Sequence, residues 1–126
     1  MLRNALGLTG AKLGCALEQC GACAVLVDGM PALSCVRAVS EFAGRDIETV
    51  EGLAGDDTGR SIMDAFVEEN AAQCGYCTPG IVVATAALLR RIPAPEPADI
   101  AEALDGHLCR CGSHSRVLRA IRRVAA

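Results

Sequence analysis

Aromatic side chains are scarce in this chain of 126 residues, which has one tyrosine, two phenylalanines and no tryptophan. Proteins that bind single-stranded nucleic acid stack the bases on such side chains. The chain also lacks an excess of basic residues, because its formal net charge is −3 at pH 7. A domain that binds DNA or RNA usually carries a basic patch or stripe. We therefore expect no nucleic acid among its partners.

Long apolar runs are missing as well, so the sequence predicts no membrane span. The first ten residues, MLRNALGLTG, lack the apolar core of a signal peptide. We expect a cytoplasmic protein, or one that is associated with a membrane only through a partner. A composition that is 52% hydrophobic still predicts a folded chain rather than a disordered one.

Cysteine, by contrast, is abundant, with eight residues in the chain. In a reducing compartment, cysteines in this number are more often metal ligands than disulfides. They form two groups of different spacing. The first group, C-x4-C-x2-C-x11-C, is Cys15, Cys20, Cys23 and Cys35, and the second, C-x2-C-x31-C-x-C, is Cys74, Cys77, Cys109 and Cys111.

The composition changes near residue 52, which divides the chain into residues 1–52 and 53–126. The first part is rich in glycine and short apolar runs. Asp28-Gly29 between the runs CAVLV and PALSCV predicts a β-hairpin. We also predict a short helix over Leu2–Leu8 and a strand over Asp46–Val50.

The second part has long alanine-rich runs with helical spacing, and we predict four helices. Thr78 is the expected N-cap of the second helix and Pro79 its first residue. The helix ends at two arginines, which suit a helix C-terminus. The other three are expected over Ser61–Ala72, Ala98–Leu104 and Ser115–Ala125.

The first cysteine group has the spacing that plant-type ferredoxins use for a 2Fe–2S cluster. Such a cluster needs soft thiolate donors and backbone N–H groups that point at the sulfurs. Gly14, Gly21 and Ala22 suit a loop of that kind. A zinc site or disulfides would be the alternatives, but zinc sites usually join two closely spaced pairs.

The second group is ambiguous when taken alone, because its spacing also fits zinc. Both pairs lie at predicted helix N-termini, where the helix dipole favours a thiolate. His107 and His114 flank Cys109 and Cys111 and are candidate ligands. We expect them instead to be solvated loop histidines beside the site.

Three segments together resemble one family. GLTGAKLGCALEQCGACAVLVDG, AAQCGYCTPG and GHLCRCGSHSR occur in this order, and the resemblance covers nearly the whole chain. They are similar to the small iron–sulfur subunit of the molybdenum hydroxylases, the xanthine oxidase family. The resemblance implies an α+β chain, with a plant-ferredoxin-like β-grasp domain at 1–52 and a helical domain, a four-helix bundle, at 53–126.

The resemblance also implies the cofactors. Each domain would hold one 2Fe–2S cluster, with the first cysteine group as ligands of the outer cluster and the second group as ligands of the inner one. Gln73 matches a glutamine that contacts the pterin of the molybdenum cofactor, although without the family it reads as a polar residue at a helix end. Cys111 matches the cysteine nearest that pterin.

The function implied by the resemblance is electron transfer within an oxidoreductase complex. A large molybdopterin-binding subunit would hydroxylate the substrate, and a flavin or cytochrome c subunit would accept the electrons. This chain would carry no substrate chemistry of its own. CALEQC and CRCGSHSR resemble the branch that acts on nicotinate or isoquinoline. A zinc-stapled interaction module without a redox role is the alternative, and a free-standing ferredoxin fits less well because of the second group.

Two departures from the family carry expectations. Family members have a further β-hairpin before the segment that matches LRNALGLTG, so we expect the β-grasp sheet of this chain to lack that hairpin and the isolated chain to be unstable. Ala16 and Glu18 stand where the family often has glycine, so the first cysteine loop is expected to be strained or differently turned. The charge of Glu18 is expected to lower the potential of the outer cluster.

Overall fold

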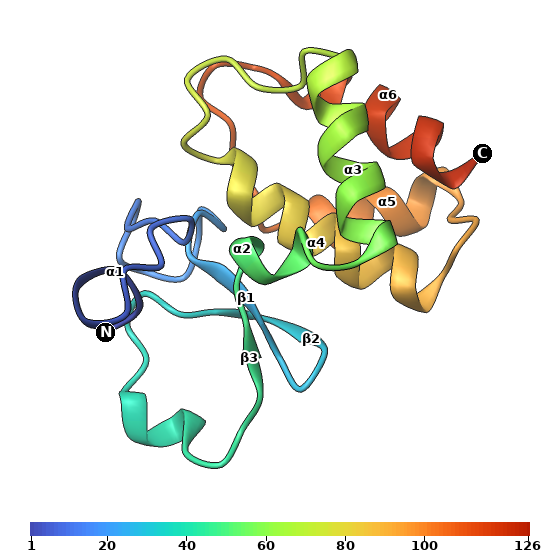
Figure 1. Cartoon of the computed structure of the whole chain (residues 1–126). Coiled ribbons are helices and arrows are strands. Elements are labelled where there is room, and N and C mark those ends of the chain that lie inside the picture. Colours follow the sequence, from blue (N-terminus) through green and yellow to red (C-terminus); the bar gives the residue numbers. More distant parts are fainter.

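The computed structural model describes the whole chain, residues 1–126, as a mixture of helices and one small sheet (Figure 1). The strands are β1 (Ala24–Val27), β2 (Met30–Leu33) and β3 (Ile47–Glu48), and a 3-10 helix covers Val39–Phe42. The α-helices are α1 (Leu2–Ala5), α2 (Val50–Leu53), α3 (Asp57–Glu68), α4 (Thr78–Arg91), α5 (Pro97–Leu104) and α6 (His114–Ala125). None of these helices is both long enough and apolar enough to cross a lipid bilayer.

The predicted hairpin is confirmed and forms the centre of the sheet. β1 pairs with β2 in an antiparallel register that sets Ala24 opposite Leu33. The turn residues Asp28 and Gly29 both have positive φ, 51° and 80°. This backbone is the one that an Asp-Gly hairpin turn requires. β1 also pairs with β3, so the strand order is β2-β1-β3.

The predicted strand over Asp46–Val50 is too long, because β3 contains only Ile47 and Glu48. At Thr49 the chain turns into α2, which places Leu53 in the core with no exposed surface. Burial of this leucine therefore overrides the strand pattern of its neighbours. The predicted helix over Leu2–Leu8 is also shorter in the structure, where α1 ends at Ala5.

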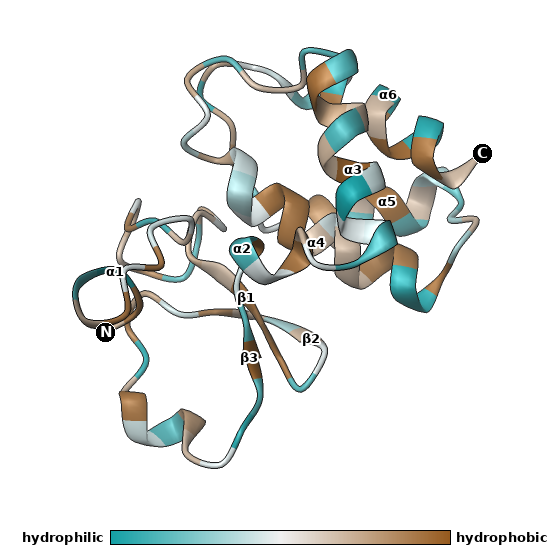
Figure 2. Ribbon diagram, in the orientation of Figure 1, coloured by the Kyte–Doolittle hydropathy of each residue, from teal (hydrophilic) through white to brown (hydrophobic).

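Helix α4 is the central element of the second part of the chain. It packs against α2, α3, α5 and β1. Figure 2 shows apolar residues along α4 and in the helices around it, and the buried core contains residues of α3, α5 and α6 together with those of α4. Its residues from Gly80 to Ala86 are all buried, together with Leu88 and Leu89. A helix that is buried on all sides reads in the sequence as a continuous apolar run, as this one does.

The four predicted helices exist, but their starts differ from the expectation. α3 begins at Asp57 instead of Ser61, because the Asp56 side chain caps it by accepting a hydrogen bond from the Gly59 N–H at 2.6 Å. It ends at Glu68, before Asn70, whose φ of 50° is left-handed. α4 includes Thr78 as its first residue, so Cys77 and not Thr78 is the N-cap. α5 and α6 each begin one residue before the predicted start.

Helices α3 and α6 lie side by side and are joined by charged side chains. Arg119 Nε lies 3.0 Å from Glu69 Oε2, and Arg123 Nη1 lies 3.3 Å from Glu69 Oε1. On the inner side, Ile62 and Phe66 of α3 and Val117 of α6 are buried in the core. This arrangement fixes the two loops that precede α4 and α6, and these loops carry the second cysteine group.

Candidate functional site

The first three cysteines lie in the irregular loop between α1 and β1. Its backbone is tightly turned, with φ of 55° at Ala16 and at Glu18. The turn brings the N–H groups of Leu17 and Gln19 to 3.3 Å and 3.2 Å from Cys15 Sγ. These hydrogen bonds lower the pKa of the Cys15 thiol to about 7. The loop therefore has the inward-pointing amides that the sequence predicts, with positive φ at an alanine and a glutamate.

Two glycines of this loop let other side chains come close to the backbone, where a Cβ atom would collide with them. A Cβ atom at Gly14 would lie 2.7 Å from Cys20 Sγ, so the glycine leaves room for the sulfur. Gly21 has a φ of 80°, and a Cβ there would lie 2.3 Å from His107 Nδ1. Gly14 is thus explained by the space that the Cys20 sulfur needs. Gly21 is explained by its positive φ and by the space that His107 needs.

The β-hairpin brings the third and fourth cysteines of the group together. Cys23 precedes β1 and Cys35 follows β2, and their thiol groups are neighbours. The Ser34 N–H donates to Cys23 Sγ at 3.3 Å, and its hydroxyl donates to the Cys23 carbonyl at 2.7 Å. Burial raises the pKa of the Cys23 thiol. The first group thus consists of two pairs, Cys15 with Cys20 and Cys23 with Cys35.

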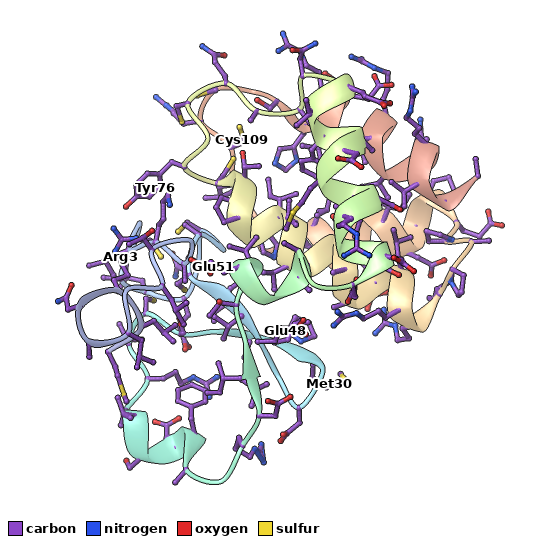
Figure 3. The ribbon with its side chains drawn as sticks, viewed as in Figure 1. Arg3, Met30, Glu48, Glu51, Tyr76 and Cys109 are labelled. Carbon is purple, nitrogen blue, oxygen red and sulfur yellow. The ribbon has the colours of Figure 1, made fainter.

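The second group joins the loop before α4 to the loop before α6 (Figure 3). Its thiols also form two neighbouring pairs, Cys74 with Cys111 and Cys77 with Cys109. Burial raises the pKa of Cys77 to about 11. Burial also acts to raise the pKa of Cys109, but hydrogen bonds from Ser113 outweigh it and lower that pKa to about 7. The Tyr76 backbone N–H lowers the pKa of Cys74.

This donor set fits a 2Fe–2S cluster. All eight cysteines are free thiols. A 2Fe–2S cluster contains two irons and takes two protein thiolates on each. Two neighbouring pairs in each group match that demand, and backbone N–H groups already point at the Cys15, Cys23 and Cys109 sulfurs.

The expectation that both histidines are solvated is wrong. His107 is only 7% exposed, and its Nδ1 atom is buried without a hydrogen-bond partner. It packs beside Gly21, so the first cysteine loop covers it. Burial, followed by the charge of His114, lowers the pKa of His107. His114 is half-buried, and its Nε2 atom is also buried without a partner.

The predicted pterin contact, Gln73, and the cysteine predicted to be nearest the pterin, Cys111, both lie beside Cys74. Gln73 is exposed in the loop before α4, next to the exposed Cys74. Cys111 is half-buried and neighbours Cys74. Both residues are therefore at or near the surface of this chain, where a second protein can approach.

Comparisons with known proteins agree with this geometry. A family model described as a [2Fe-2S] binding domain matches residues 49–122. The chain is 49% identical over 125 residues to a nicotinate dehydrogenase subunit from Pseudomonas putida, covering 99% of this chain and 80% of that protein. It is 42% identical to the alpha subunit of isoquinoline 1-oxidoreductase from Brevundimonas diminuta, with 99% and 82% covered.

A solved structure gives the same result. The crystal structure of quinoline 2-oxidoreductase from Pseudomonas putida 86 contains a chain that matches this one with a TM-score of 0.90 and 39% identity, over 98% of this chain and 76% of that chain. This chain belongs to the small iron–sulfur subunits of the molybdenum hydroxylase family. As a member of that family, it is part of an oxidoreductase complex.

Contacts between the two cysteine groups of this iron–sulfur subunit were not foreseen from the sequence. The Leu108 N–H donates to the Cys20 carbonyl at 3.0 Å, which joins the residue before Cys109 to a cysteine of the first group. The Tyr76 hydroxyl donates to the Leu13 carbonyl at 2.5 Å (Figure 3). Such contacts join residues far apart in sequence, and no local pattern marks them.

The ion pair between Glu18 and Arg37 was also missed. Arg37 Nε lies 2.7 Å from Glu18 Oε1. The sequence pattern drew attention to the charge of Glu18 but not to its partner. Arg37 follows Cys35 by two residues, and this position is the one signal that could have suggested a role near the first cysteine group.

Proposed function

We propose that this chain is the electron-transfer subunit of a molybdenum hydroxylase complex and carries two 2Fe–2S clusters. The observation that carries the proposal is the arrangement of the eight thiols as two sets of four, each set made of two neighbouring pairs. In this assignment Cys15, Cys20, Cys23 and Cys35 hold the outer cluster. Cys74, Cys77, Cys109 and Cys111 hold the inner cluster.

Each bound cluster would accept and release one electron at a time. The protein supplies thiolates to hold the irons and amide N–H groups to stabilise the negative charge on the sulfurs. The first site takes such amides from Leu17, Gln19 and Ser34 and the second from Ser113. These donors support metal binding by the two thiol sets, because they favour the thiolate form that metal ligation requires.

The hydrogen bond between Leu108 and Cys20 supports a relay between the two sites. Leu108 is bonded to Cys109 of the second group. A single hydrogen bond therefore connects the backbone next to Cys109 with the backbone of Cys20 in the first group. Electrons from a catalytic centre in the partner would reach the second site first and leave from the first. This order of electron transfer follows because Gln73 and Cys111, which we assign to the surface facing the partner, lie at the second site.

We further propose that a large molybdopterin-binding subunit covers the surface near Gln73 and Cys111. Gln73 would hydrogen-bond the pterin, and Cys111 would be the nearest ligand of the inner cluster. The acceptor would be a flavin or cytochrome c subunit. Relatives named for nicotinate and isoquinoline support an N-heterocyclic aromatic compound as the substrate class of the complex. We place the complex in the cytoplasm, or at a membrane through a partner.

The division of the chain at residue 52 is part of the same proposal. The three-stranded sheet with the first cysteine loop would be the plant-ferredoxin-like β-grasp domain of residues 1–52. Helices α3, α4, α5 and α6 would be the four-helix bundle of residues 53–126. Support comes from the packing of α4 against α3 and α5, with its N-terminus beside Gly21.

Low-temperature EPR of the reduced chain, purified with its partner subunits, tests the proposal together with iron and zinc counts. We expect two distinct 2Fe–2S signals and about four irons per chain, two for each cluster. One signal with one zinc would contradict the two-cluster relay. Absence of iron, with zinc bound, would establish the alternative of a zinc-stapled interaction module.

A further inference from the structure

An ion pair joins the two segments that carry the first cysteine group. Glu18 lies in the loop between Cys15 and Cys20, and Arg37 lies two residues beyond Cys35. Arg37 Nε donates to Glu18 Oε1 at 2.7 Å, and Arg37 Nη1 lies 3.4 Å from Glu41 Oε2. The pair therefore bridges the ligand loop and the chain that leaves the hairpin.

The loop that Glu18 belongs to is held in an unfavourable backbone conformation. Ala16 and Glu18 both have a φ of 55°, a region in which a side chain with a Cβ atom is disfavoured. In this conformation the Leu17 and Gln19 N–H groups lie 3.3 Å and 3.2 Å from Cys15 Sγ. If the loop relaxed, these hydrogen bonds to the sulfur would be lost.

No glycine relieves the strain at these two positions, so an interaction that opposes relaxation would help to preserve these hydrogen bonds. The ion pair is suitably placed, because it originates at Glu18 itself. The side chains of Glu18 and Arg37 are 32% and 43% exposed, so water weakens the attraction without removing it. The pair can therefore contribute a moderate, measurable bias toward the turned loop.

We propose that Glu18 and Arg37 form an ion-pair clasp, in which both act as positioning residues for the first iron–sulfur site. The clasp keeps the cysteine loop in the conformation that holds a cluster and slows the loss of that cluster. It also sets the positive charge of Arg37 between the carboxylates of Glu18 and Glu41 beside the site. The inference rests on the proposed outer cluster at Cys15, Cys20, Cys23 and Cys35.

The test compares variants of the complete complex. Glu18→Gln keeps the size of the side chain, Arg37→Gln shortens it, and each substitution removes one charge. We expect either variant to lose the first cluster to an iron chelator roughly fivefold faster than the wild type, as suits one exposed ion pair. The double variant should lose it no faster than either single variant, because the interaction is already absent. The EPR signal of the second cluster is the internal control.

Ala16→Gly is the matched control for the backbone. It removes the cost of positive φ in the same loop and leaves the ion pair intact. We expect this variant to lose the first cluster more slowly than the wild type. If it instead lost the cluster as fast as Glu18→Gln, disturbance of the loop, and not the ion pair, would explain the result and the clasp would be refuted.

The reduction potential of the first cluster separates the clasp from a merely structural role. Glu18→Gln removes a negative charge beside the first site and should raise the potential, because the reduced cluster carries more negative charge. Arg37→Gln leaves a negative charge and should lower it. The proposal would be overturned if both single variants shifted the potential in the same direction. It would also be overturned if the effects of the two substitutions on the rate of cluster loss added up in the double variant.

The two proposals fail in different ways. A wild-type complex without a first 2Fe–2S signal would refute the proposed outer cluster. A wild-type complex with both signals, whose Glu18 and Arg37 variants lose the first cluster at the wild-type rate, would refute the clasp alone.

Discussion

Gly80 is the residue at which helix α4 meets the first cysteine loop. A Cβ atom at this position would lie 2.1 Å from the Gly21 carbonyl oxygen and 3.3 Å from the Ala22 Cα atom. The obstacle is backbone, which cannot move aside as a flexible side chain can. Direct packing of the two parts of the chain therefore depends on the absence of a side chain at Gly80.

We predict that Gly80→Ala destabilises the fold by about 1–3 kcal/mol, as overpacking does in a well-packed core. A loss of stability would be informative, because alanine otherwise stabilises a helix more than glycine does. Thermal unfolding of the wild type and the variant measures the difference. Gly106→Ala is the control, since a Cβ atom at Gly106 meets nothing within 4 Å. Equal melting temperatures for Gly80→Ala and the wild type would contradict the close packing.

At the scale of the element, helix α3 owes its start to Asp56. The Asp56 carboxylate accepts from the Gly59 N–H and also pairs with Arg90 of α4, which in turn lies 2.8 Å from Glu48 of β3. The backbone hydrogen bond from Gly59, and then Arg90, hold the pKa of Asp56 below its ordinary value of 3.8, against burial, which raises it. One side chain thus joins the start of α3 to the end of α4.

We predict that Asp56→Ala lowers the free energy of unfolding by about 1 kcal/mol, the usual cost of losing an N-cap. Because the folded-state pKa is depressed, this stabilisation is present above about pH 3.8 and is lost as the pH falls through the lower folded-state value. Chemical unfolding of both proteins at several pH values measures it. The difference should be constant near neutrality and shrink below pH 3.8.

Asp64→Ala is the matched control for this helix. Asp64 is an exposed residue within α3, beyond its first turn. Its replacement should change the stability by less than about 0.5 kcal/mol, as is usual for surface positions. A loss equal to that of Asp56→Ala would show that the capping hydrogen bond contributes nothing specific.

At the scale of the whole molecule, the two thiol sets are separate sites on adjoining loops. The thiols of each set neighbour only thiols of the same set. The loops of the two sets are joined by the hydrogen bond between Leu108 and Cys20 and by the one between Tyr76 and Leu13. The molecule therefore joins two separate thiol sets by two hydrogen bonds between their loops.

We predict that Cys35→Ser removes the first EPR signal and about half of the iron and retains the second signal, because serine is a poor replacement for a soft thiolate ligand. Cys77→Ser should do the reverse, and the two variants are each other's control. EPR and iron analysis of the purified complexes give the answer. Loss of both signals in the Cys35→Ser variant would contradict the independence of the sites.

Several features of this protein were determined by the sequence alone, because the information for them is local. Asp28-Gly29 specifies the hairpin turn through its positive φ angles. The apolar spacing in α6, with Val117 and Ile121 buried as expected, specifies the inner face of that helix. The spacing of the cysteines indicated two thiol sets, and the family comparisons confirmed a 2Fe–2S-binding chain.

The tertiary structure alone decided which groups meet across the chain. It set the pairing of Cys74 with Cys111, the burial of His107 under Gly21 and the ion pair of Glu18 with Arg37. It also moved the start of α3 to Asp57, where the cap and the packing agree. Hydrogen bonds and burial depend on distances between segments far apart in sequence, and those distances exist only once α4 is packed against the sheet and the other helices.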